Sequence, residues 1–183
     1  MLQITIPETE FYDEAQNEFV TVRRQELQLE HSLISVSKWE SKWHESFLTR
    51  KDPMTLEQSI DYVRCMTLNK NVDPRCYATL SAKEMQRIDE YVNNPMTATT
   101  FNERDGGKKR GGRQVITSEI IYYWMTALQI PFECEKWHLN RLLTLIHVCD
   151  LKQQPSKKMS KAAAMNQQRS LNAARRSRMH SKG

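Results

Sequence analysis

The C-terminal segment 152–183 restricts the fold of this chain more than any other feature, because it cannot supply a hydrophobic core. It has nine Lys or Arg residues, no Asp or Glu, and few bulky apolar residues. Such a segment buries too little apolar surface to offset the conformational entropy lost on ordering. We therefore expect one globular domain over residues 1–151 and a basic tail over residues 152–183, partly helical or disordered.

Charge divides the chain at the same position. The whole chain has 27 basic and 22 acidic residues, so the nine cations of the tail leave 18 basic against 22 acidic residues in the body. A mildly acidic body followed by a cationic segment is typical of a protein with an interaction tail. Seven cations of the tail are therefore candidate partner-binding residues: Lys157, Lys158, Lys161, Arg169, Arg175, Arg176 and Arg178.

The partner of this tail can be nucleic acid or protein. Clustered cations neutralise backbone phosphates and give binding that depends strongly on salt. The same cations can pair with an acidic protein surface, including the body of a neighbouring copy in a homo-oligomer. The tail has no Phe, Trp or Tyr, and single-stranded nucleic-acid binders stack bases on aromatic rings. A protein partner is therefore favoured.

The first part of the body has the pattern of β-strands. Residues 2–6, LQITI, alternate at period two, and FVTV with the leucines of QELQL continues this character. Residues 1–36 are thus predicted to be β-rich, as a small sheet or hairpin. Trp39, Trp43 and Phe47 then recur at the spacing of one helical face. With residues 37–151 predicted to be mainly helical, the expected fold class is α+β.

Two capping boxes mark the first clear helices. Thr55 with Gln58, and Ser81 with Glu84, place a hydroxyl and an acceptor three residues apart in front of apolar residues at helical spacing. The range 102–114 follows with four glycines and five cations, and is predicted to be a mobile loop. Its sequence lacks the GxxxxGK[ST] pattern of a phosphate-binding loop, so solvated surface charge is the favoured interpretation.

Two further helices are predicted near the end of the body. Thr117, Ser118 and Glu119 precede IIYYWMTAL, which is apolar nearly all round and is expected at the centre of the core. Pro131 interrupts the helical pattern, and a last helix is expected over residues 133–151.

The last predicted helix contains Cys134, His138, His147 and Cys149. A zinc site needs four converging ligands, and one straight helix cannot bring residues this far apart to one ion. A catalytic Cys–His pair needs an orienting third group and an oxyanion-stabilising loop, and no such sequence motif is present. We therefore expect packed thiols and imidazoles, with no metal, no cofactor and no enzymatic activity.

The sequence contains no run of 18 apolar residues and begins without a secretory signal pattern. We expect a protein that stays in a reducing cytosol, does not bind membranes and keeps its four cysteines as thiols.

Several strings of the sequence resemble small tail-module proteins of long-tailed bacteriophages of Gram-positive hosts, in the tail assembly chaperone class. They are TSEIIYYWM and WHLNRLLTLI in the body and LNAARR in the tail, with weaker similarity in LQLEH and SKWESKW. The resemblance implies a non-enzymatic helper that binds the tape measure protein and assists assembly of the tail tube, with the tail tube protein as a candidate second partner. It also implies a location in the host cytoplasm during assembly and not in the mature virion.

Two other functions remain alternatives at this stage. One is a structural virion component, such as a head–tail connector or tail terminator. The other is a nucleic-acid-binding phage regulator that uses the basic tail.

Overall fold

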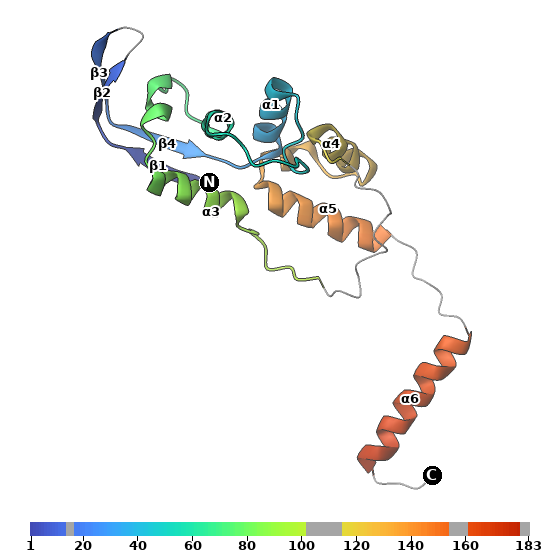
Figure 1. Cartoon of the computed structure of the whole chain (residues 1–183). Coiled ribbons are helices and arrows are strands. Elements are labelled where there is room, and N and C mark those ends of the chain that lie inside the picture. The colour runs from blue at the N-terminus through green and yellow to red at the C-terminus, as the bar shows by residue number, and fades with distance from the viewer. Residues whose placement is uncertain (14–16, 102–114, 154–160, 180–183) are drawn as a thin grey trace. The chain divides into compact units, whose positions relative to one another are not determined.

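The computed structural model describes residues 1–13, 17–101, 115–153 and 161–179. The chain divides into two compact units, Met1–Leu151 and Lys152–Gly183 (Figure 1). The predicted loop over residues 102–114 lies outside the described residues, as do Lys157 and Lys158.

The N-terminal strands form one long antiparallel hairpin with an interruption in the middle. Ile6 pairs with Gln25 on one side of the interruption, and Thr9 pairs with Val22 on the other, so two residues are skipped on each strand and the register is kept. Pro7 stands at the break, where its missing N–H removes one ladder hydrogen bond. The four strands are β1 (Leu2–Ile6), β2 (Thr9–Asp13), β3 (Glu18–Val22) and β4 (Gln25–Leu29).

The inner half of this hairpin supports the core. Ile4, Ile6, Leu27 and Leu29 alternate with exposed neighbours and are buried, which is the pattern of a strand pair with one covered face. The free edge of β4 also pairs with the segment after α2, because Leu68 N–H donates to the Gln28 carbonyl at 2.8 Å. The hairpin is therefore anchored by apolar burial on one face and by backbone hydrogen bonds along one edge.

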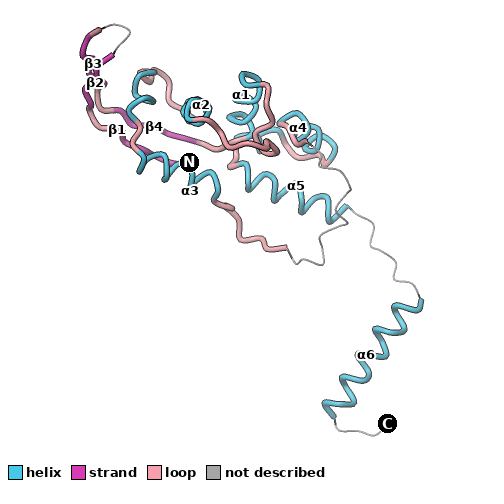
Figure 2. The backbone as a smooth tube through the Cα atoms, in the orientation of Figure 1, coloured by secondary structure: helices cyan, strands magenta, loops and turns pink. Residues whose placement is uncertain are grey.

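Helices build the rest of the body (Figure 2). Both predicted capping boxes are confirmed. The Thr55 and Ser81 hydroxyls accept from the backbone N–H of Gln58 and Glu84, and the side chains of Gln58 and Glu84 accept from the backbone N–H of Thr55 and Ser81. The small strand pairs and the mainly helical body confirm the α+β class. The helices of the body are α1 (Leu33–Trp43), α2 (Leu56–Met66), η1 (Pro74–Thr79), α3 (Ala82–Asn93), α4 (Ser118–Ala127), η3 (Phe132–Lys136) and α5 (Leu139–Gln153). The second unit contains α6 (Lys161–Met179).

Three sequence-based boundaries were wrong. The helix α1 starts at Leu33, inside the range 1–36 predicted to be β-rich, because Ser32 caps it by accepting from Ser35 N–H. It ends before Phe47, since His44 adopts a left-handed conformation with φ of 54°. The single helix predicted over residues 133–151 is two helices, η3 and α5, with an extended residue at Trp137.

Candidate functional site

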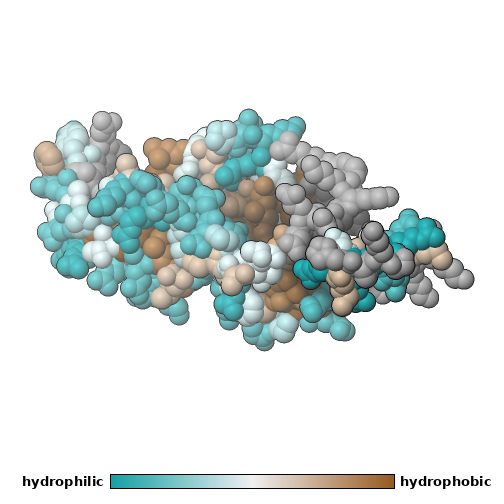
Figure 3. Space-filling view, turned by 90° about the horizontal axis from the view of Figure 1, so that it is seen from below, coloured by the Kyte–Doolittle hydropathy of each residue, from teal (hydrophilic) through white to brown (hydrophobic). Residues whose placement is uncertain are grey.

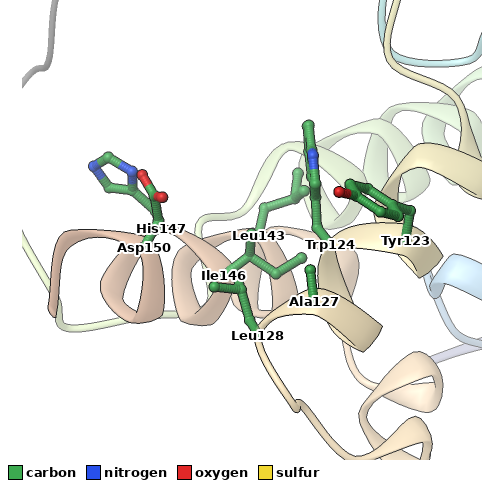
Figure 4. Close-up of a pocket in the computed structure, with 8 residues that line it drawn as sticks. All are labelled: Tyr123, Trp124, Ala127, Leu128, Leu143, Ile146, His147 and Asp150. Atoms are coloured by element: carbon green, nitrogen blue, oxygen red, sulfur yellow. The ribbon is translucent and has the colours of Figure 1, made fainter. Parts of the chain in front are cut away.

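An apolar groove of about 450 Å³ lies between α4 and α5 (Figure 4). In the close-up, the aromatic rings from α4 stand at one end, the imidazole and carboxylate from α5 stand at the other, and aliphatic side chains lie between them. Its size is in the range of pockets that bind ligands or partner side chains. The lining residues are Tyr123, Trp124, Ala127, Leu128, Leu143, Ile146, His147 and Asp150.

The groove exists because α4 has more apolar residues than the core accepts. Ile121 and Met125 point inward and are fully buried, whereas Tyr123 on the other side of the helix is 68% exposed. The prediction that α4 is central to the core was therefore only half right. Its surplus aromatic side chains form one wall of the groove, and Ala127 leaves space beside them.

The helix α5 provides the opposite wall. Leu139, Leu142 and Ile146 hold it against the core, since they are buried at helical spacing. The next residue, His147, is partly exposed, and its ring contacts the Phe101 ring edge-on at a centroid distance of 4.3 Å. This contact fixes one end of the groove.

Sequence reasoning missed the groove. The groove could have been predicted from IIYYWM, which contains more aromatic residues than one buried helical face can hold. Apolar residues also reach the surface in separate patches on the face shown in Figure 3. A helix that is apolar all round is therefore compatible with an exposed binding wall as well as with a central position.

A second cavity, of about 280 Å³, borders α2, α3 and the start of α5. Its polar side chains are hydrogen-bonded within the chain. Arg50 donates to the Phe47 carbonyl at 3.0 Å, and Asn140 donates to the carbonyls of Val92 and Asn94 at 2.9 and 2.8 Å. These bonds hold loops together, so the groove between α4 and α5 is the stronger candidate for a binding site.

The predicted partner-binding residues of the tail belong to the other unit. Arg169, Arg175, Arg176 and Arg178 lie on α6 and are exposed. Arg169 and Arg176 share one face at a spacing of seven, and Arg175 and Arg178 share another at a spacing of three. Lys161 is the first residue of α6. The helix thus presents arginines on two different faces.

The Cys and His residues that the sequence singled out do not come together as one group. Cys134 is buried in η3 and His138 is buried immediately before α5, whereas Cys149 lies within that helix. Among residues 1–13, 17–101, 115–153 and 161–179, no group of three or more His, Cys, Asp or Glu side chains is placed to hold a metal ion. The four cysteines are free.

Burial keeps the thiols of Cys76 and Cys134 protonated. It raises the pKa of Cys134, and it raises the pKa of Cys76 to about 11. A thiol is a far weaker nucleophile than a thiolate. We expect Cys76 and Cys134 to resist a disulfide reagent in the native protein at pH 7.5 and to react at once in urea. The amount of thiolate that the reagent releases, recorded over time, gives the number of reacted cysteines. Immediate reaction of all four cysteines in the native protein would contradict the prediction.

A buried cluster of two imidazoles and two phenols joins α2 and α3 to the residues just before α1 and α5. The rings of His31 and His138 meet edge-on at 4.9 Å. His31 Nδ1 is hydrogen-bonded to the Tyr62 hydroxyl, and His138 Nε2 donates to the Tyr91 carbonyl at 3.0 Å. His138 Nδ1 is buried and, within the described part of the chain, has no hydrogen-bond partner. The sequence had singled out His138 but not His31.

Burial disfavours the charged form of both imidazoles. Desolvation by burial and, to a smaller extent, the neighbouring His138 together lower the pKa of His31 to about 3. Desolvation also lowers the pKa of His138, against the opposing effect of its hydrogen bond to Tyr91. Both rings are therefore neutral at pH 7 and act as packing and hydrogen-bonding groups.

No family model, curated protein or solved structure matches this chain. The helices that the structure describes include none long and apolar enough to span a membrane.

Proposed function

We propose that this protein is a non-enzymatic assembly chaperone of a phage tail, which binds the tape measure protein while the tail tube is built. The observation that supports this most is the apolar groove between α4 and α5. The strings TSEIIYYWM and WHLNRLLTLI, which resemble the tail assembly chaperone class, lie in and just before these two helices. The third string, LNAARR, lies in α6.

The groove suits a helical partner with an apolar stripe. A helix that lays apolar side chains into a groove leaves its backbone hydrogen bonds intact, so only side chains must match. A groove of 450 Å³ takes a few such side chains and not a whole helix. The resulting contact is small enough to be reversible, as a chaperone requires.

The exposed arginines of α6 support a second contact. Arg169, Arg175, Arg176 and Arg178 offer bidentate donors to carboxylates on an acidic protein surface. In the proposed function this surface belongs to the tape measure protein or to a tail tube subunit. The contact is electrostatic and should therefore weaken as salt is raised.

The proposal is tested by co-expression with fragments of the cognate tape measure protein. We expect at least one helical fragment to become soluble and to co-purify with the full chain at moderate salt. A fragment with the same composition but a shuffled apolar stripe is the control and should stay insoluble. If no fragment tiled along the tape measure protein associates at low or moderate salt, the proposed function is wrong.

Two further experiments separate the alternatives. Mass spectrometry of purified virions would detect a connector or terminator in stoichiometric amount, whereas a chaperone is expected to be missing. Within the part of the chain that the structure describes, a nucleic-acid-binding regulator is favoured by the arginines of α6 alone. It predicts DNA or RNA binding that is lost in the full chain carrying R169Q, R175Q, R176Q and R178Q. We expect both the native and the substituted chain to bind duplex DNA with similarly low affinity.

A further inference from the structure

We propose that the outer half of the hairpin pairs edge to edge with a second copy of this chain, through β3. The two copies of β3 run antiparallel about a two-fold axis at Thr21 and give a four-stranded sheet in the order β2, β3, β3, β2. This pairing is independent of the proposed function. It follows from an uncovered strand edge and from a sequence that complements itself in this arrangement.

One edge of β3 is uncovered in the described part of the chain. β3 pairs there with β2 alone, so alternate N–H and C=O groups along its other edge lack a strand partner. Figure 1 shows β2 and β3 at one extremity of the body. Further along the same side, β4 is covered, because Leu68 N–H donates to the Gln28 carbonyl at 2.8 Å. The available edge therefore runs over residues 18–24.

This edge is held in place by the core. Val20 and Val22 are buried on one face of the strand, whereas Phe19 and Thr21 on the other face are exposed. The Phe19 ring also packs edge-on against the Tyr12 ring, at a centroid distance of 5.2 Å. A sheet of two strands is marginally stable in water, and two more strands extend its ladder of hydrogen bonds. The strand is thus ordered enough to act as a template and gains stability from a partner.

The centre of the edge matches itself. The available residues read EFVTVRR. When two copies overlap fully in antiparallel order, Thr21 faces Thr21 of the second copy. Val20 faces Val22, and the two-fold axis repeats this contact on the other side. Facing pairs of β-branched residues stabilise a sheet.

The ends of the edge match in charge. Glu18 faces Arg24 of the second copy, and Phe19 faces Arg23, whose guanidinium is attracted to an aromatic ring. Among the described residues, Glu18 and Arg23 form no ion pair. Arg24 lies 3.7 Å from Glu26 of its own chain, but both side chains are more than two thirds exposed. Water screens such a surface pair, so Arg24 is free to exchange it for Glu18 of the second copy.

The edge of β2 does not match itself. Residues 8–13 include three acidic residues and no Lys or Arg, so two copies of β2 would bring carboxylates together. Pro7 also precedes this strand and has no N–H to donate, which is a common protection of strand edges. Self-pairing is therefore specific to β3.

The first arm of the test measures the mass of the full chain by sedimentation equilibrium over a range of concentrations. We expect a reversible dimer, since one strand edge gives a small interface, and we expect it to weaken as salt is raised. A chain that stays monomeric up to the highest soluble concentration at low salt would overturn the inference.

The second arm reverses charge at the two facing positions. Glu18→Arg places two arginines opposite each other twice, and Arg24→Glu does the same with two carboxylates. Each variant alone should dimerise about tenfold more weakly or worse than the native chain, whereas an equimolar mixture should form a heterodimer of near-native affinity. The control is Glu10→Arg, at an exposed residue of β2, which should change the affinity by less than about threefold. Far-UV circular dichroism confirms that the variants fold.

The third arm locates the axis. Residues that face each other in an antiparallel pair have Cα atoms about 4.5 to 5.5 Å apart, which a disulfide can span. Thr21→Cys should therefore form a covalent dimer under mild oxidation, whereas Thr5→Cys, at an exposed residue of β1, should not. A dimer that ignores both charge reversals, or one that Thr21→Cys does not cross-link, would show that another surface forms it and would overturn the inference.

Discussion

Replacement of Glu40 by alanine is expected to lower the free energy of unfolding by about 3 to 5 kcal/mol, because it removes an acceptor shared by two buried backbone donors. Glu40 is 7% exposed. Its Oε1 accepts from the Phe47 N–H at 2.8 Å, and its Oε2 accepts from the Ser118 N–H at 2.7 Å. One carboxylate therefore ties the chain reversal after α1 to the first turn of α4.

The size of this effect comes from what the substitution leaves behind. Hydrogen bonds to an ionised group contribute about 1.5 to 3 kcal/mol each, and an unsatisfied buried donor bears its full desolvation penalty. The carboxylate also faces the positive N-terminal end of α4. Alanine supplies no acceptor at either position.

Urea unfolding at pH 7 measures the prediction. The control is Glu57→Ala, which removes an exposed carboxylate from the first turn of α2. It should cost less than about 1 kcal/mol, since only its interaction with the helix end is lost. A loss of similar size in both variants would show that the two buried N–H groups do not depend on Glu40.

Stability is expected to fall by about 3 kcal/mol between pH 7 and pH 4, through protonation of His31 in the unfolded chain. The pKa of His31 is about 3 in the folded protein, against an ordinary value of 6.5. The unfolded state thus binds the proton more readily than the folded state. The stabilisation is complete above pH 6.5 and is lost progressively as the pH falls towards 3.

His138 acts in the same direction, because burial also lowers its pKa. Urea unfolding at pH 7, 6, 5 and 4 gives the free energy of unfolding as a function of pH. The slope of this dependence is compared between the native chain and His31→Gln. The variant should be less stable at pH 7 and should lose less stability on acidification. His44→Asn is the control, since His44 is exposed, and asparagine tolerates the left-handed conformation at that position. If the slope in His31→Gln equals that of the native chain, the loss of stability in acid does not come from His31.

The elements that the sequence predicted correctly depend on neighbouring residues. The capping boxes at Thr55 and Ser81 are closed by side chains three residues away, so a short window contains the whole interaction. The strand pairs follow equally from alternation and a local connection. Each could be predicted because its stabilising contacts lie close together in the sequence.

The elements predicted wrongly are fixed by contacts that helical spacing does not reveal. Phe47 continues the helical spacing of Trp39 and Trp43, but the Glu40 side chain and the left-handed His44 turn the chain before it. Its ring still reaches Trp39, at a centroid distance of 5.4 Å. The spacing therefore predicted a correct contact and an incorrect helix.

The same reason explains the division of the last helix of the body. His138 forms an isolated bridge with Ser32, and Leu139 N–H donates to the His31 carbonyl at 2.7 Å. These partners lie more than a hundred residues earlier in the chain. No local pattern reveals them, and the groove was missed for a similar reason, since periodicity does not say which apolar face stays uncovered.

The long hairpin with one register has a consequence for the order of events during translation. Its residues all precede Glu30 and pair with one another, and such a hairpin can form in about 1 to 10 microseconds. Leu139, which docks on the residues just after it, leaves the ribosome roughly 5 to 20 seconds later at ordinary rates of synthesis. The hairpin can therefore be formed in the nascent chain several seconds before the helix that begins at Leu139 is available to pack beside it.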